Sequence, residues 1–339
     1  MPDGVQAAGG GVKPCPEFRT AICDLLGIDV PILQGAMQGG GGVDLVAAVS
    51  EAGGLGVLAT FGGGDAKLRE DIAMVRSRTA KPFGVNIMPM GRGITERCVA
   101  TCIELDVPVV TTGRADPGED AVTKLKAAGI KVVSVIPTVA HAKRMEAEGV
   151  DAVVASGCEA GGHVGYVATM PLVPQVVDAV NIPVVAAGGI GDGRGFVAAL
   201  ALGACGIQMG TRFMATVESD LNAWGRHRLQ EMAETDTLVT RALTGATVRA
   251  IATPEIVAYE KAVAAGAPEA ELTALARAVR ATRSRNDKEA SRQAACGQIA
   301  GMIRDEPTVA ALMHRVLDEA SAIIGRLATV NQDNAGRRN

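Results

Sequence analysis

The sequence predicts an α/β protein in which parallel strands close into a (β/α)8 TIM barrel, with a smaller helical domain inserted after strand 8. Three observations predict this fold. Hydrophobic residues make up 48% of the 339 residues and aromatic residues only 2%, while glycine occurs 42 times, as expected for buried parallel strands joined by glycine turns. Short apolar runs alternate with helical segments, and this alternation stops near residue 215.

The apolar runs are the expected strands, and they recur roughly every 20 to 30 residues. They cover 30–33, 55–59, 83–87, 107–111, 130–135, 152–155, 183–187 and 206–209. The segments between them have the spacing of helices and cover 43–52, 66–78, 94–105, 119–128, 139–149, 172–180 and 196–202. Such an alternation closes naturally into a barrel, whose reactive groups lie at the C-terminal strand ends. A doubly wound open sheet is the alternative.

The domain boundaries follow from where the alternation begins and ends. Residues 18–214 are the expected barrel, preceded by a tail rich in Gly, Pro and Ala at 1–17. Residues 215–290 contain no convincing strand and should form a helical domain on the substrate side. Residues 291–330 should return to the barrel and pack on it through an amphipathic helix, and 331–339 form a second tail. The active centre would then lie between barrel and appendage.

Charge and cysteine content limit the classes of partner. The net charge is −4, and the chain has no basic block, so we expect neither nucleic acid nor a membrane as partner, but a metabolite-scale ligand. The sequence shows no signal peptide and no uncharged apolar stretch of membrane length, which predicts a cytoplasmic protein. Cys98 and Cys102 have the spacing of one helix face rather than of a metal pair.

Two glycine turns follow the last two expected strands. Gly188-Gly189 ends the first of these strands and Gly210-Thr211 ends the second, so both turns should lie on the same face of the sheet. Bare backbone N–H groups there can approach an anion, and a helix N-terminus behind them adds a favourable dipole. The pair predicts a phosphate site, a common feature of the last two βα turns of a barrel. The alternative is that the glycines serve only tight turns.

The remaining strand ends carry few reactive side chains. The candidates are Gln34 to Met37 after the first strand, Asn86 with Met88 after the third, Thr111 to Gly113 after the fourth, and Glu159 to His163 after the sixth. This set contains no cluster of carboxylates for a metal, no nucleophile elbow and no lysine for a Schiff base. A phosphate-bearing cofactor must therefore carry the reaction, and flavin mononucleotide (FMN) suits best.

Three of these polar residues have a functional and a structural interpretation. His163 lies on a glycine-flanked loop beyond a strand end, which favours catalysis over a loop histidine that binds backbone. Glu159 is equally compatible with the cofactor site and with capping a helix. Arg212 can pair with phosphate or with a neighbouring carboxylate. His141, His227 and His314 fall on expected helices and are interpreted as surface or packing residues.

The motifs themselves resemble a known family from about residue 18 to 327. They include PILQGAM, KPFGVNIM, VVTTG, EGVDAVVASGCEAGGHVG, IPVVAAGGIGDGRG, IQMGTRF and CGQIAGMI. Together they are similar to the flavin-dependent enoyl-acyl-carrier-protein reductase II (the FabK type) and its relatives, the nitronate monooxygenases once called 2-nitropropane dioxygenases. The resemblance implies a homodimeric FMN-containing TIM barrel. It implies that FMN is held by Gly35, Ala36, Met37, Asn86, Thr112, Gly189, Gly210 and Thr211, that Gly297 and Gln298 approach the ring, and that His163 is the active-site histidine. Glu159, Gly162 and Gly188 complete the cofactor-binding set.

Less specific motifs favour the reductase branch of the family. KPFGVNIM, VVTTG, EAGGHVG and GQIAG are closer to the reductases, whereas GDGRGFVAALALGA also suits the monooxygenases. The reductase cycle implies NADH or NADPH as co-substrate and an enoyl thioester, or another activated alkene, as acceptor. The alternative is oxidation of a nitronate with oxygen. Tyr166 stands where reductases tend to have a basic residue, which weakens the expectation that acyl carrier protein docks there. A flavin storage or sensor protein is a third reading, and no appended signalling segment supports it.

Overall fold

The protein is described here by a computed structural model that covers residues 18–60, 64–88, 92–113, 118–282 and 295–335. The expected tail at 1–17 lies outside these residues. The expected second tail is helical as far as Ala335, because the last helix continues to that residue.

Eight parallel strands form one sheet, as predicted. They are β1 (Ile32–Gln34), β2 (Gly56–Ala59), β3 (Phe83–Ile87), β4 (Val109–Thr112), β5 (Lys131–Ile136), β6 (Ala152–Ser156), β8 (Val184–Ala187) and β9 (Gly206–Met209). The strand order is β1-β9-β8-β6-β5-β4-β3-β2. A parallel bridge between Leu33 and Leu55 joins the first and last of these and closes the barrel. The TIM barrel is therefore confirmed, and each strand lies within two residues of its predicted bounds.

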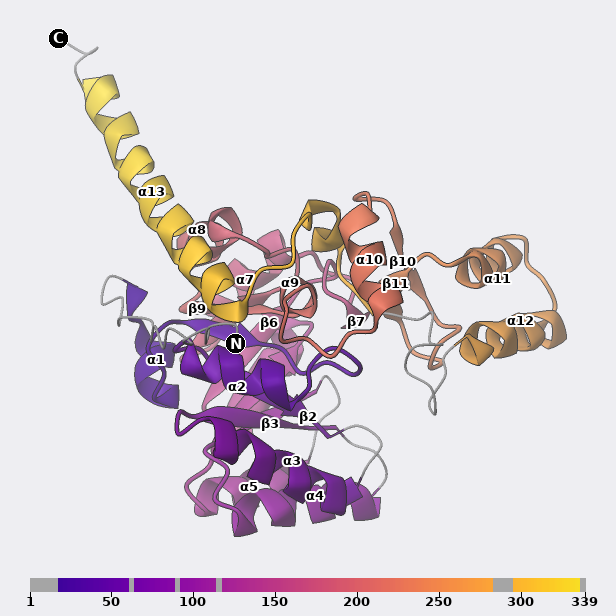
Figure 1. Cartoon of the computed structure of the whole chain (residues 1–339), viewed down its shortest axis with the longest axis horizontal. Helices are drawn as coiled ribbons and strands as arrows, with labels where there is room; N and C mark the ends of the chain where they lie inside the picture. The colour runs from indigo at the N-terminus through magenta and orange to yellow at the C-terminus, as the bar shows by residue number, and fades with distance from the viewer. Residues whose placement is uncertain (1–17, 61–63, 89–91, 114–117, 283–294, 336–339) are drawn as a thin grey trace, which may run out of the picture.

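Helices between the strands cover the outside of the barrel (Figure 1). They are α2 (Val43–Glu51), α3 (Gly64–Arg78), α4 (Arg92–Glu104), α5 (Glu119–Ala127), α6 (Val139–Ala147), α7 (Thr169–Val177), α8 (Gly193–Ala201) and the single turn α9 (Thr211–Met214). Helix α7 begins three residues earlier than predicted, ahead of Pro171, which the first turn of a helix tolerates.

The core has two layers that reflect the alternation of side chains along each strand. Outward-facing residues such as Val85 and Val110 pack against the helices. Inward-facing residues such as Val109 and Val185 fill the barrel, together with Ile22 of the short helix α1 (Ala21–Leu26). Helix α1 packs at the N-terminal end of the strands, and it leaves the C-terminal end open for a site.

The segment 215–290 is not purely helical, and this part of the prediction was wrong. It contains α10 (Ala223–Glu231), α11 (Pro254–Ala264) and α12 (Glu269–Ala281), and also the antiparallel strands β10 (Thr237–Thr240) and β11 (Val248–Ile251). A third strand, β7 (Gly162–His163), comes from the loop after β6 and pairs with β11. This small sheet joins the barrel to the appended helices, which project to one side in Figure 1.

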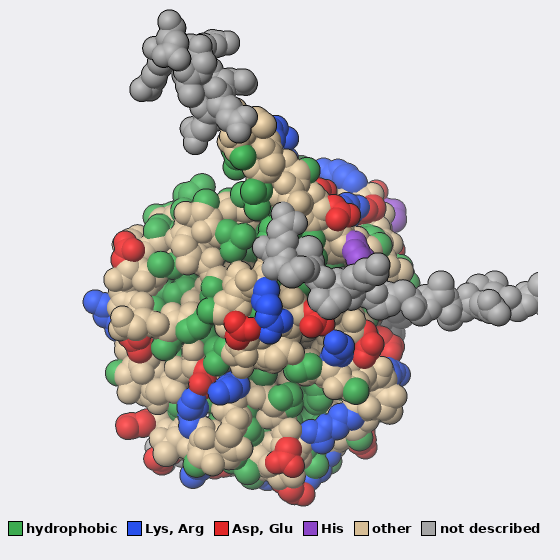
Figure 2. All heavy atoms as spheres, turned by 90° about the vertical axis from the view of Figure 1, so that its left-hand side faces the viewer, with side chains coloured by type: hydrophobic (Ala, Val, Ile, Leu, Met, Phe, Trp, Pro, Cys, Tyr) green, Lys and Arg blue, Asp and Glu red, His purple; other side chains and the backbone are tan. Residues whose placement is uncertain are grey.

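The C-terminal segment returns to the barrel as expected. A 3-10 turn at Gln298–Met302 packs on α9 and α10, and the long helix α13 (Val309–Ala335) packs its first half on α8 and α2. No helix within the described residues is long and apolar enough to cross a membrane. On the face drawn in Figure 2, acidic and basic side chains are interspersed rather than segregated.

Candidate active site

The strand register brings most of the predicted residues to one end of the barrel. Gln34 pairs with Met209, and Ala187 pairs with both Ser156 and Gln208. Gly35 therefore lies beside Gly210, and its N–H donates to the carbonyl of Met209 at 3.0 Å. The turns after β1, β8 and β9 thus share one rim of the barrel.

The two glycine turns have the geometry of an anion cradle. Gly188 and Gly189 have φ values of 93° and 71°, a left-handed conformation that glycine adopts without a steric penalty. No described residue accepts a hydrogen bond from the N–H groups of these two glycines. Gly210 is the N-cap of α9, and no side chain caps this helix. Backbone donors are therefore available at both turns, as a phosphate group requires.

The N-terminus of α8, the helix behind the first turn, was predicted to face a phosphate, but it faces carboxylates instead. The Asp192 carboxylate accepts hydrogen bonds from Arg194 N at 3.0 Å and Gly195 N at 3.3 Å, and Glu319 accepts one from Gly193 N at 2.9 Å. Burial alone would raise the pKa of Asp192, but its hydrogen bond with Arg194 and these N–H groups lower it. The N-terminus of α8 is thus already occupied by carboxylates, and a phosphate must rely on the glycine turn and on α9.

Glu159 acts as a helix cap. Both carboxylate oxygens accept a hydrogen bond from Thr169 N at 3.0 Å, and Thr169 is the first residue of α7. The Thr169 hydroxyl also lies 2.9 Å from the carbonyl oxygen of Gly188. The structure therefore shows the capping role of Glu159, and its expected place among the cofactor ligands stays a prediction. It holds the Gly188 turn in place indirectly.

The return segment completes this side of the site. Gln298 N donates to the carbonyl of Glu159 at 2.9 Å, and Gly297 N donates to the Thr211 hydroxyl at 2.8 Å. A Cβ on Gly297 would lie 2.6 Å from that same carbonyl oxygen, so this position excludes any side chain. The backbone of Gly297 and Gln298 therefore borders both the loop after β6 and the second glycine turn, in agreement with the expectation that the pair approaches the site.

The inner face of the barrel carries a ring of polar side chains at this end. Asn86 Nδ2 donates to Thr111 Oγ1 at 2.9 Å, and both side chains are buried. Thr112 lies on the opposite face of β4, where its hydroxyl pairs with Ser134 at 2.7 Å beneath the helices. The Thr112 side chain therefore faces the helices, whereas Thr111, also among the predicted candidates, faces the barrel interior.

Two residues of this ring were not among the predicted ligands. Ser156 is the last residue of β6 and Gln208 the last but one of β9, and both face inward, since their strand neighbours Ala155 and Ile207 face the helices. Gly35 leaves room for Gln208, because a Cβ there would lie 3.1 Å from Gln208 Nε2. Applying the two-residue period of a strand to each predicted strand end would have found both.

The first strand end connects the barrel to the appendage. Ala36 is partly buried against the barrel interior, and Met37 packs both on the outer barrel core and on the small cluster that includes Met214 and Cys296. A Cβ on Gly210 would meet Met37 Sδ at 3.4 Å. Gly35, Ala36 and Met37 thus line the boundary between the barrel rim and the helical appendage, where the sequence predicted the site.

His163 lies on a strand and not on a loop as predicted. Gly162, with φ of 76°, and His163 form β7 and pair with Arg249 and Val248 of β11. The imidazole is exposed, and its Nε2 lies 3.4 Å from the Thr244 hydroxyl. Arg249 fixes this sheet, because its Nε donates to the carbonyl of Cys158 at 2.9 Å. The histidine is therefore held by regular backbone pairing beside the barrel mouth (Figure 1).

Arg212 pairs with a neighbouring carboxylate, one of the two partners that the sequence allowed. Its side chain is 5% exposed, and its Nη1 lies 3.1 Å from Asp305 Oδ1. Burial lowers the pKa of Arg212, and Asp305 opposes that shift. The guanidinium therefore anchors the return segment to α9.

Metal binding finds no support in the described part of the chain. No group of three or more His, Cys, Asp or Glu side chains there could hold an ion. Cys98 and Cys102 are both buried on α4, and burial raises the pKa of the Cys102 thiol to about 12.

The fold and the site define a class of protein: a TIM barrel with a glycine cradle for phosphate at the ends of β8 and β9 and a polar ring in its mouth. The family model described as nitronate monooxygenase matches residues 19–97 and 89–319. The chain therefore belongs to the nitronate monooxygenase family, which includes FabK, and it is a flavin oxidoreductase.

Three relatives illustrate the range of the family. An octahydro-indene-carboxyl-CoA dehydrogenase from Rhodococcus jostii is 43% identical over 228 residues, 67% of this chain and 64% of that protein. A probable nitronate monooxygenase from Staphylococcus aureus is 36% identical over 277 residues, 69% of this chain and 78% of that protein. The structure of FabK from Thermotoga maritima superposes with a TM-score of 0.84 at 39% identity and covers 92% of this chain and 99% of FabK.

Proposed function

We propose that this protein is an FMN-dependent oxidoreductase that uses NADH or NADPH to reduce the 2,3 double bond of an enoyl thioester or a related activated alkene. The observation that carries the proposal is the rim shared by the glycine cradle and the return segment. It supplies backbone donors for a phosphate. The likeness to FabK and to a CoA-ester dehydrogenase favours a thioester as substrate.

The residues present fit FMN. Backbone N–H groups of Gly188, Gly189 and the first turn of α9 would hold its phosphate, while Asn86 and Gln208 offer polar groups on the inner face. When bound, FMN would accept hydride from the nicotinamide and deliver it to the β-carbon of the alkene. The tight packing at Gly297 would help to exclude water from the ring.

His163 would supply the proton that the α-carbon needs. Its imidazole is exposed at the barrel mouth and can exchange a proton with solvent between turnovers. The Thr244 hydroxyl, 3.4 Å from Nε2, would fix the ring orientation. A strand position suits this role because the pairing of β7 with β11 limits how far the imidazole can move.

The alternative function is oxidation of a nitronate with oxygen through FMN. The family model and the Staphylococcus relative favour it. His163 would then take a proton from the substrate or orient it, so the same residue serves either reaction.

Stopped-flow absorbance separates these functions. The purified yellow protein is first reduced anaerobically with NADH or NADPH and then mixed with crotonyl-CoA in one series and with air-saturated propyl nitronate in another. We expect the thioester to reoxidise the flavin faster than dissolved oxygen does. In a third series, the oxidised protein is mixed anaerobically with propyl nitronate. Reduction of the flavin in that series, with no reoxidation by any enoyl thioester tested, would assign the protein to the alternative function.

A further inference from the structure

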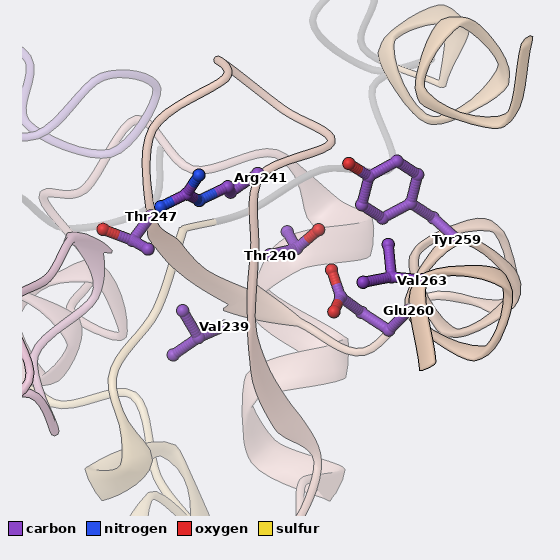
Figure 3. Close-up of a pocket in the computed structure, with 7 residues that line it drawn as sticks. All are labelled: Val239, Thr240, Arg241, Thr247, Tyr259, Glu260 and Val263. Atoms are coloured by element: carbon purple, nitrogen blue, oxygen red, sulfur yellow. The ribbon is translucent and has the colours of Figure 1, made fainter. Parts of the chain in front are cut away.

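A second cavity, separate from the barrel mouth, lies between the β10–β11 hairpin and α11. Its volume is about 240 Å³. Figure 3 shows Arg241 and Thr247 at one end, Tyr259, Glu260 and Val263 of α11 at the other, and Thr240 between them. The two ends differ in chemistry, which restricts the kind of ligand that fits.

One end is a site for an anion. The guanidinium of Arg241 is exposed, and it makes no hydrogen bond or ion pair with any residue that the structure describes. Most other arginines near the sheet are engaged; for example Arg249 binds the Cys158 carbonyl and Arg228 binds Asp236. An unengaged guanidinium beside a cavity presents planar donors that match a phosphate group.

The other end suits a planar, neutral group that carries hydrogen-bond donors. The ring of Tyr259 is partly buried against the hairpin, and Val263 and Val239 add apolar surface. Glu260 lines the same end, and within the described residues its carboxylate has no ion-pair partner. A carboxylate repels a second anion but accepts hydrogen bonds from hydroxyl or amino groups. The ligand should therefore be anionic at one end only.

The cavity is linked to the candidate catalytic histidine through one turn. The turn between β10 and β11 carries Arg241 and Thr247, and it also carries Thr244, whose hydroxyl lies 3.4 Å from His163 Nε2. A hydrogen bond from Gly245 N to the carbonyl of Arg241, at 2.9 Å, closes this turn. A long ligand that reacts beside His163 can thus extend across the turn and place its distal end in the cavity.

We propose that this cavity binds the adenosine phosphate portion of a co-substrate, with the phosphate on Arg241, the base against Tyr259 and a ribose hydroxyl or the amino group on Glu260. The inference rests on the proposed function for the identity of the co-substrate. Two co-substrates carry this group: a coenzyme A thioester and NAD(P)H. A thioester on acyl carrier protein lacks adenosine, so the cavity favours coenzyme A over carrier protein.

Calorimetric titration of the FMN-loaded protein with ADP and with adenosine 3′,5′-bisphosphate tests the site without turnover. We expect at least one of them to bind, and Arg241→Gln to raise its Kd about 10-fold or more. Val263→Trp, which fills the cavity, should weaken binding as well. Arg277→Gln is the matched control, because Arg277 is exposed on the neighbouring helix α12 and does not line the cavity. Failure of both nucleotides to bind, or equal binding by all variants, would overturn the proposal.

Steady-state kinetics then identify the source of the adenosine. If it is coenzyme A, Arg241→Gln raises KM for crotonyl-CoA and leaves KM for crotonyl-pantetheine unchanged. If it is the nicotinamide co-substrate, the variant raises KM for NADH or NADPH and leaves KM for reduced nicotinamide mononucleotide unchanged. A protein that binds ADP in the cavity but reduces no enoyl thioester would refute the proposed function and retain this site.

Discussion

His163 combines an exposed imidazole with a backbone held in a sheet. Its partner Val248 fixes the main chain, and the hydroxyl of Thr244 lies 3.4 Å from Nε2. An exposed histidine on a loop would sample many orientations, whereas one on a paired strand returns to the same place after each proton transfer. The geometry therefore supports a proton-transfer role better than a loop would.

His163→Ala should retain FMN and lose most turnover with the carbon substrate. We expect a decrease of about 10²–10⁴-fold, the usual contribution of a general acid or base. Stopped-flow reoxidation of the reduced flavin by crotonyl-CoA measures this step directly, and flavin reduction by NAD(P)H should change less. His227→Ala is the control, because His227 is exposed on α10 beside Glu231. Equal reoxidation rates in the variant and the wild type would make His163 a structural residue.

Gly189→Asp should remove FMN from a folded barrel. A carboxylate at this turn would repel a phosphate and occupy the approach to the backbone donors. Gly266→Asp is a matched control, since Gly266 has φ of 70° against 71° at Gly189 and no atom lies within 4 Å of its would-be Cβ. Both variants should lose a similar amount of stability, on the order of 1 kcal/mol. The ratio of flavin to protein absorbance after gel filtration should fall only in Gly189→Asp.

At the candidate site, the sequence locates backbone positions more readily than side-chain directions. Gly188, Gly189 and Gly210 follow strands whose ends were easy to locate. The side chain of Thr112 faces the helices, and the sequence alone does not show this direction, because a one-residue shift in a strand reverses the side chain. Glu159 has two physically equal readings in sequence, and only its contact with Thr169, ten residues away, shows the capping role.

At the level of elements, the strands β10 and β11 were the main feature that the sequence did not reveal. Each has four residues, TLVT and VRAI, and the second contains a buried arginine. Such short runs give a weak period-two signal. The pairing of β7 with β11 joins residues more than 80 positions apart, and no local pattern reports a contact of that range.

The barrel strands were predictable for the opposite reason. Most of their residues are buried, and each strand contains a short apolar run. The environment of the helix N-termini was harder to predict than the strands. The N-terminus of α8 was expected to face an anion, but Asp192 caps it, whereas α9 has no side-chain cap and remains available.

For the whole molecule, the site lies where three separate parts of the chain meet. The barrel rim supplies the glycine turns, the small sheet supplies His163, and the return segment closes over the loop after β6 through Gly297 and Gln298. The sequence placed the active centre between barrel and appendage, and this placement stays a prediction. It could not predict that one carbonyl, that of Glu159, accepts the hydrogen bond from the return segment.

The projecting half of helix α13 carries an exposed apolar stripe. The buried positions Val316 and Ala320 of this helix continue at the spacing of a heptad to Ile323 and Leu327. That second half projects beyond α8 in Figure 1, and hydrophobic side chains cover part of it in Figure 2. Ile324 is 39% exposed and Leu327 is 54% exposed. A second copy of the same helix would cover this stripe with matching residues, because a two-fold interface brings the same surface of each protomer together.

We therefore predict a homodimer that depends on the projecting half of α13. Leu327→Glu should raise the dimer dissociation constant at least about 10-fold, because association would bury an unpaired carboxylate in an apolar seam. Ala322→Glu, a change at an exposed position of the same helix outside the seam and its flanking positions, is the control and should have little effect. Sedimentation velocity over a range of protein concentrations measures both variants, and their flavin content should match the wild type because the change lies far from the glycine turns. A monomeric wild type, or a dimer indifferent to Leu327→Glu, would place the interface elsewhere or remove it.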